Sequence, residues 1–162
     1  MKKQILIIVA VMFLLMETTL VNAASLEINW INPEKYRDIK AGNQHRKSFQ
    51  EQVFKELEEH FSALAMKLPE EQILKIDVTD IDLAGDVNIG GIERVRIITE
   101  LYFPRMKFSY QLLNADKSVV SSDEVDLKDM SFMMHSNLRY KSKSFGYERK
   151  MLDEWFKDTF SN

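Results

Sequence analysis

The chain has 162 residues, a length that fits one domain better than two. It carries a formal net charge of −3, which argues against nucleic acid as the main partner because phosphate binding requires a basic surface. It has no cysteine, which excludes disulfides, thiolate nucleophiles, cysteine-based zinc sites and lipidation at a cysteine. The sequence also has no Gly-rich phosphate loop, zinc-binding histidine pair or nucleophile elbow, so no cofactor is predicted.

The N-terminus has the layout of a secretory signal peptide. Two lysines follow the initiator methionine and precede an uncharged apolar run, Ile5–Met16, and small or compact side chains lead up to Ala23. A retained membrane anchor is the alternative, but it needs about 20 apolar residues, and Glu17 interrupts this run. We therefore expect residues 1–23 to be cleaved and residues 24–162 to form a single soluble domain in the periplasm.

The first half of this domain is predicted to contain a strand, a short turn and a long helix. Apolar and polar residues alternate over Leu26–Trp30, which indicates a half-buried strand. The segment Asn32-Pro33-Glu34 is typical of a capped helical turn, with asparagine as the N-cap and proline at the first helical position. A capping-box pattern predicts that the long helix begins at Ser48, and a start at Asn43 is also possible. Apolar residues then recur at three- and four-residue steps until Pro69 ends the helix.

The next strand begins at about Ile73 and is expected to be irregular. Its apolar residues change parity along the strand, and a side-chain period of two cannot absorb that change without an extra residue. We therefore predict a β-bulge or bend near Thr79-Asp80. Beyond the bulge, Asp80 and Asp82 are expected to point the same way and Asp77 is not.

Three more strands and a helix complete the predicted domain. Residues 95–103 form the third strand, and Met106–Leu112 and Val119–Leu127 form a hairpin. A wide apolar stripe from Tyr147 to Phe160 predicts the final helix. The predicted fold class is α+β, a two-layer sandwich whose mainly antiparallel five-stranded sheet carries both helices on one face. If the first two strands are neighbours, the helix between them makes that pair parallel.

Several short motifs are spread over the chain from about Leu26 to Phe160. They are Asn32-Pro33-Glu34-Lys35-Tyr36, Thr79-Asp80-Ile81-Asp82-Leu83-Ala84-Gly85, Phe103-Pro104-Arg105, Leu127-Lys128-Asp129-Met130, and Tyr147-Glu148 with Leu152 and Trp155-Phe156. In these motifs the chain resembles the domain-of-unknown-function 3016 family of exported proteins from Gram-negative bacteria. One departure is Asn-Pro in the first motif, where the family has Asp-Pro. The resemblance implies an envelope location and a shared fold, and it assigns no catalytic residue and no ligand.

An acidic run surrounds the predicted bulge and the loop after it. It contains Asp77, Asp80, Asp82 and Asp86, and carboxylate oxygens are the ligands that Ca²⁺ and Mg²⁺ prefer. The metal hypothesis assigns Asp80, Asp82 and Asp86 as ligands, although their spacing does not match an EF-hand loop. The favoured interpretation is that these carboxylates are solvated and discourage edge pairing of the strand, and a partner-binding surface is the third alternative.

A second group of possible metal ligands is Met130–His135. Thioethers and imidazole are soft ligands that favour Cu(I). We favour core packing instead, because methionine is an adaptable core filler and Phe132 indicates an apolar segment tucked against the sheet.

The segment from residue 139 to residue 150 is basic and interleaved with aromatic residues. Its cations are Arg139, Lys141, Lys143, Arg149 and Lys150. Such a surface fits an anionic partner, such as an anionic glycan, a lipid headgroup or an acidic protein. The alternatives are an internal role, with the segment folded across the acidic run, or a solvated surface.

A single binding-site hypothesis groups the charged residues of the motifs with the basic segment. Its members are Asp80, Asp82, Arg105, Asp129, Arg139, Lys141, Lys143 and Glu148. Within this group Arg105 is expected to pair with one of the acidic residues, and Glu148 is expected to lie in the first turn of the last helix, where the dipole favours it.

The favoured function is a periplasmic binding or accessory module that contacts another envelope protein or an anionic polymer through its loops. The first alternative is a metal-binding protein that uses the segment Asp77–Asp86 or the cluster Met130–His135. A further alternative is an enzyme acting on envelope substrates, which is disfavoured because only three histidines are available as near-neutral bases.

Overall fold

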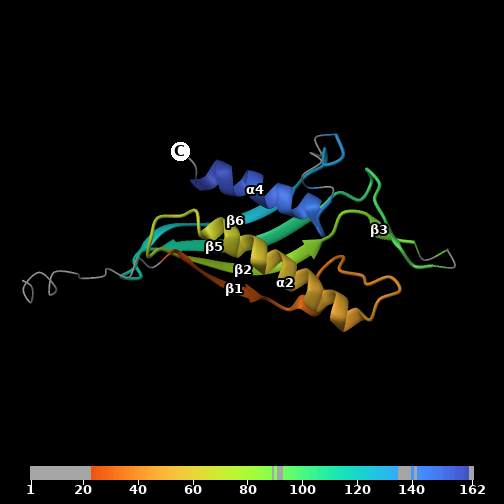
Figure 1. Cartoon of the computed structure of the whole chain (residues 1–162), viewed down its shortest axis with the longest axis horizontal. Helices are drawn as coiled ribbons and strands as arrows, with labels where there is room; N and C mark the ends of the chain where they lie inside the picture. The colour runs from red at the N-terminus through yellow and green to blue at the C-terminus, as the bar shows by residue number, and fades with distance from the viewer. Residues whose placement is uncertain (1–22, 89, 91–92, 135–139, 141, 161–162) are drawn as a thin grey trace, which may run out of the picture.

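The computed structural model describes residues 23–88, 90, 93–134, 140 and 142–160. The elements are β1 (Ser25–Trp30), the 3-10 turn η1 (Pro33–Lys35), α2 (Arg46–Ala65), β2 (Ile73–Asp82), β3 (Asp86–Val87), β4 (Arg96–Ile97), β5 (Arg105–Leu113), β6 (Val119–Lys128) and α4 (Gly146–Phe160). Figure 1 shows a sheet with two helices lying across one face and, at the right-hand end, a projecting segment that carries β3. We call the described residues from Asp86 to Ile97, which include the paired strands β3 and β4, the arm. Most of the predicted signal peptide lies outside the described residues. No helix in the described ranges has the length and apolar character needed to cross a membrane.

The main sheet is mixed and has four strands in the order β1-β2-β5-β6. The pair β1-β2 is parallel, as expected for neighbouring strands joined through a helix, and the other two pairs are antiparallel. The predicted α+β class with two helices is therefore confirmed. The prediction of a mainly antiparallel sheet of five strands is wrong in the number of strands, because the main sheet is mixed and has four.

The arm accounts for the missing fifth strand. Within residues 95–103 only Arg96–Ile97 is a strand, and it pairs with Asp86–Val87 in a separate two-stranded ribbon. The apolar residues of this segment lie on the surface, since Leu101 is 74% exposed and Val95 is 49% exposed. The spacing of these apolar residues is that of a strand in the main sheet, but the segment does not belong to that sheet.

The predicted bulge is confirmed in β2. Asp77 pairs with Ser109 of β5, and the register then shifts so that Asp80 pairs with Lys107. Ser109 and Lys107 are two residues apart and therefore share one face of the sheet. Asp77, Asp80 and Asp82 consequently lie on the same face, and the expectation that Asp77 points away from the other two is wrong. The bulge restores the parity that the sequence breaks.

Both helix starts differ in detail from the prediction. Helix α2 begins at Arg46, and its N-cap residue His45 forms no side-chain capping bond, so the capping box at Ser48 is not used. In the turn η1, Pro33 occupies the expected position, whereas Asn32 has a left-handed backbone and forms no side-chain cap. Neither start therefore uses the side-chain cap that the sequence predicts.

The hydrophobic core lies between the sheet and the two helices. Helix α2 buries Val53, Leu57, Phe61 and Leu64 of the predicted apolar stripe, and it also buries Ala65. Two further residues of the stripe, Phe49 and Phe54, are partly buried. Helix α4 adds an aromatic cluster in which the Trp155 ring lies 4.8 Å from Phe108 and 5.6 Å from Tyr110, measured between centroids. One face of the sheet therefore carries both helices.

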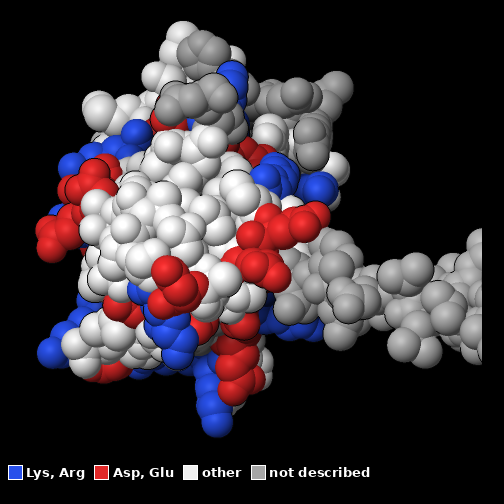
Figure 2. All heavy atoms as spheres, turned by 90° about the vertical axis from the view of Figure 1, so that its left-hand side faces the viewer, with Lys and Arg blue, Asp and Glu red and all other residues white. Residues whose placement is uncertain are grey.

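The opposite face of the sheet is uncovered and polar. Ion pairs cross it, including Lys75 Nζ to Glu27 Oε2 at 2.7 Å and Lys107 Nζ to Asp126 Oδ2 at 3.3 Å. Charges of both signs are also interspersed around an uncharged area at one end of the molecule (Figure 2).

Phe61 provides a test of this packing. Its side chain is wholly buried and makes edge contacts with Phe108 and Trp155, at centroid distances of 5.7 and 6.4 Å. The substitution Phe61→Ala is expected to lower the free energy of unfolding by about 3–5 kcal/mol in urea denaturation. Met66→Ala, at a position that is 65% exposed, is the control and should change it by less than about 0.5 kcal/mol. Equal losses in the two variants would contradict the proposed core.

Candidate functional site

Some of the residues singled out by the sequence meet around the C-terminal end of β2. The segment after η1 is hydrogen-bonded to this end, because Asp38 N–H donates to Ile81 O at 3.0 Å and Leu83 N–H donates to Asp38 O at 3.1 Å. The Tyr36 hydroxyl donates to Val78 O at 2.7 Å. These bonds place Asp38 beside the edge of the sheet, where its carboxylate is buried.

Arg96 of β4 joins this segment to the turn after β2. Its Nη1 lies 2.9 Å from Asp38 Oδ2 and its Nη2 lies 3.3 Å from Asp38 Oδ1, which is a two-pronged ion pair. The same guanidinium donates to Gly85 O at 2.7 Å and to Lys40 O at 3.2 Å. Arg96 therefore connects its own strand to two other stretches of the chain, residues 38–40 and residues 83–85.

A second set of charges lies on the uncovered face at the same end of β2. Arg37 lies 3.8 Å from Asp80 and 3.7 Å from Asp82, and Arg105 Nε lies 3.7 Å from Asp82 Oδ2. Burial raises the pKa of Asp82, and the charges of Arg105 and Arg37 offset only part of that rise. The Arg105 guanidinium also stacks over the ring of Phe103, 4.2 Å from its centroid. We refer to Arg37, Asp38, Asp80, Asp82, Arg96 and Arg105 together as the charged network.

Glu148 reaches the end of β2 from the helix side. It lies in the first turn of α4, is 2% exposed, and accepts a hydrogen bond of 2.7 Å from Ala84 N–H. Burial raises the pKa of its carboxyl, although the Ala84 bond and the charge of Arg96 act in the opposite direction. A carboxyl that is enclosed and bonded to backbone has the arrangement of a structural group, not of a general acid open to substrate.

Other polar contacts join the last helix to its neighbours. Lys150 Nζ lies 3.1 Å from Asp129 Oδ2, and Arg149 pairs with Glu56 of α2. The His60 Nε2 lies 3.1 Å from Asp153 Oδ1, and burial lowers the pKa of this histidine. These pairs fix α4 against α2 and against the loop that follows β6.

The structure therefore brings together part of the predicted binding site. Asp80, Asp82 and Arg105 converge on the uncovered face, and Glu148 meets the same end of β2 through Ala84. Asp129 belongs to the neighbouring pair with Lys150.

The described cations of the basic segment differ in their surroundings. Arg149 and Lys150 pair internally, but with Glu56 and Asp129 and not with the acidic run. Lys143 is exposed. Arg139 and Lys141 lie outside the described residues.

The predicted metal ligands form ion pairs with basic side chains of the protein. Asp86 Oδ1 lies 3.0 Å from Lys40 Nζ, while Asp80 and Asp82 face Arg37. Within the described ranges, no three acidic or histidine side chains form a group that could hold a metal ion. The metal hypothesis remains a prediction that these contacts do not support.

The methionine cluster is not core, contrary to our expectation. Only Phe132 is buried, at 0% exposure, whereas Met130, Met133 and Met134 are 71%, 38% and 80% exposed. His135 lies outside the described residues. This short loop buries one large side chain, which contacts Tyr147 of α4, and leaves the neighbouring methionines exposed.

Sequence reasoning missed two residues that organise this region, Asp38 and Arg96. Asp38 lies in what reads as a polar connection, and Arg96 lies in what reads as a strand of the main sheet. They are 58 positions apart in the chain, so no periodic or spacing signal links them.

Comparisons with known proteins assign the chain to a family. The model of a family described as "Protein of unknown function (DUF3016)" matches residues 24–158 of the chain. No curated protein and no solved structure matches the chain.

The buried carboxyl of Glu148 predicts a pH dependence of stability. Because burial raises its pKa in the folded state, the unfolded chain, with an ordinary glutamate pKa of 4.5, loses this proton first as the pH rises. The free energy of unfolding of the wild type therefore falls as the pH rises above 4.5, until the carboxyl of the folded state also ionises. Glu148→Gln keeps the acceptor for Ala84 N–H and cannot ionise, so its stability relative to wild type should increase with pH.

Urea denaturation from about pH 4 to about pH 8 measures this difference. Glu58→Gln, on the exposed face of α2, is the matched control and should follow the wild type. A difference between Glu148→Gln and wild type that does not vary with pH would show that the Glu148 carboxyl is not destabilised by burial.

Proposed function

We propose that this chain, which belongs to the DUF3016 family, is an exported binding module that contacts a protein partner in the cell envelope through loops at one end of its sheet. Export is supported by the signal-peptide layout of the N-terminus and by a family match that begins at residue 24. The binding role rests on one observation, a group of exposed apolar side chains on two adjoining loops.

These loops precede β5 and follow β6. Leu101 and Tyr102 on the first loop are 74% and 45% exposed, and Met130 and Met134 on the second are 71% and 80% exposed. We call these four residues the loop surface. Large apolar side chains gathered on a surface are typical of protein interaction sites, and methionine adapts to partners of irregular shape.

The two loops adjoin and are fixed to the rest of the domain. Asp129 N–H donates to Pro104 O at 3.2 Å, and Gly85 N–H donates to Tyr102 O at 2.8 Å. Beneath the second loop, Phe132 is buried against Tyr147, with their ring centroids 4.7 Å apart. Figure 1 shows both loops at the end of the sheet nearest the start of α4. A rigid scaffold that presents loops in this way is a common design for recognition.

The charged network supports this reading over catalysis. Its acidic side chains are neutralised by arginines at 2.9–3.8 Å, and these arginines also bind backbone carbonyl groups or a ring. Such contacts immobilise loops. They also keep the carboxylates in ion pairs, which favours a structural role over a catalytic one. The network therefore serves as the support of the binding surface.

Site-specific photocrosslinking in cells tests this function. A photoreactive phenylalanine analogue placed at Leu101 or at Met134 should give a crosslinked adduct of one discrete mass, containing the same partner protein from both positions. Met66, which is 65% exposed on α2, is the matched control position and should give no such adduct. The adduct should also disappear when Tyr102→Asp is introduced, because a charge in an apolar interface is costly to desolvate. No adduct from either loop, or the same adduct from Met66, would refute the proposed surface.

A further inference from the structure

A hollow of about 380 Å³ lies between the segment before α2 and the arm. Its wall carries four cationic side chains, those of Arg37, Lys40, Arg46 and Arg94, and one acidic side chain, that of Glu34. We call these four cations and the hollow they line the basic cleft. The excess of positive charge is local, because the whole chain has a formal net charge of −3.

Two of the four cations lack a counter-charge in the described part of the chain. Lys40 pairs with Asp86 at 3.0 Å, and Arg37 faces Asp80 at 3.8 Å. Arg46 and Arg94 form no ion pair with any described residue. Guanidinium groups without a protein partner are available to a ligand, and their planar fork matches the oxygens of a phosphate group.

The backbone of the cleft is fixed in place. Arg94 O accepts a hydrogen bond of 3.0 Å from Asn43 N–H, and Arg94 N–H donates to Asn43 Oδ1 at 3.0 Å. Gly42 has a φ of +61°, and a Cβ atom there would lie 2.1 Å from Arg94 O, so only glycine permits this approach. The backbone of Arg94 is therefore held beside the segment before α2 without a ligand, so binding need not order that backbone.

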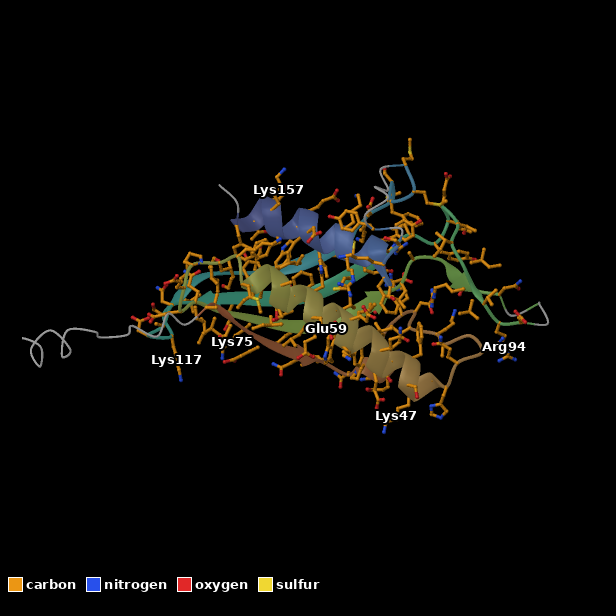
Figure 3. The ribbon with its side chains drawn as sticks, in the orientation of Figure 1. Lys47, Glu59, Lys75, Arg94, Lys117 and Lys157 are labelled. Carbon is orange, nitrogen blue, oxygen red and sulfur yellow. The ribbon has the colours of Figure 1, made fainter. Side chains whose placement is uncertain are left out.

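The start of α2 adds to the positive potential of the cleft. The first turn has no acidic residue, and Arg46 and Lys47 place cations at the positive end of a 20-residue helix. This arrangement opposes the helix dipole and costs stability. Figure 3 shows Lys47 and Arg94 at the same end of the molecule, with Lys117 at the other end.

We infer that the basic cleft binds the phosphate group of a small anionic ligand, with Arg46 and Arg94 as the principal contacts. The volume of the hollow lies within the usual range of ligand sites, about 300–1,000 Å³. An adjoining hollow of about 350 Å³, which includes Phe49 and Phe145 in its wall, gives room for an apolar part of the ligand. This inference does not depend on the loop surface, because the two sites share no residue.

Thermal unfolding with inorganic pyrophosphate is the direct test. A ligand that binds only the folded state raises the melting temperature, so pyrophosphate should raise it by several degrees in buffer free of phosphate. The shift should shrink at high NaCl concentration, because salt screens exposed charges. Unchanged melting over a pyrophosphate titration would overturn the inference.

Calorimetric titration of variants locates the site. Arg46→Gln and Arg94→Gln should each weaken pyrophosphate binding about 10- to 100-fold, which is the loss expected for one charge-assisted contact. Lys117→Gln, at the other end of the molecule, removes the same charge and should leave the affinity unchanged. Equal weakening in all three variants would show that pyrophosphate responds only to overall charge and would overturn the inference.

Arg46→Glu separates binding from folding. In the absence of ligand this variant should melt at a temperature no lower than wild type, because an acidic side chain suits the start of a helix. It should nevertheless show no pyrophosphate shift. A variant that melts well below wild type would mean that Arg46 serves the fold, which would contradict the inference.

The source of the phosphate group is decided by two further probes. Vesicles of phosphatidylglycerol that retain the protein, with no retention on vesicles of phosphatidylcholine, would identify a lipid headgroup. Binding of pyrophosphate without retention on either vesicle would identify a soluble phosphate ester. Both outcomes support the cleft as a phosphate site, whereas a protein that shows no pyrophosphate shift overturns it whatever the vesicles retain.

Discussion

The ion pair between Arg96 and Asp38 is the contact on which this end of the molecule depends. Neither residue belongs to the main sheet, yet their bond ties the segment before α2 to the arm and to the turn after β2. Asp38 is 7% exposed, and without Arg96 its only remaining ion pair among the described residues would be the one to Lys40 at 4.0 Å. Breaking a buried ion pair costs up to about 3–5 kcal/mol. Such a pair need not increase the net stability of the fold. It specifies one arrangement of loops that have little core of their own.

The proposed sites follow from that arrangement. The arm supplies Arg94 to the basic cleft, and the segment that continues from it supplies Leu101 to the loop surface. Both positions lie within a few residues of Arg96, so one fixed guanidinium sets the position of both. The main sheet provides the rigid base, and its polar face remains uncovered. Both proposed binding sites therefore lie mainly on loops, whereas the hydrophobic core lies between the sheet and the helices.

The sequence predicts those features that depend on local patterns. Most of the apolar stripe of α2 and the alternating apolar residues of β5 are buried, as predicted. The change of parity in β2 predicts a bulge, and the structure has one there. Long-range pairing gives no such pattern, so the bond of Asp38 to Arg96 could not be predicted. Alternation also misleads where no surface covers a segment, as at Leu101, and apolar composition misleads in the same way at Met134. Of the grouped charges, Arg105 was correctly expected to pair with an acidic residue, whereas the enclosure of Glu148 required the tertiary structure.

Hydrogen exchange of Arg96→Met tests the central role of this ion pair most directly. The amides to compare are those of Asn43, Gly85 and Asn88, which are bonded to the arm or to the loop that follows it, with amides between β2 and β5 as the internal reference. We predict that the three loop amides exchange much faster in the variant while the reference amides keep their protection. Unchanged protection at Asn43 and Asn88, or an equal loss across the sheet, would contradict the account.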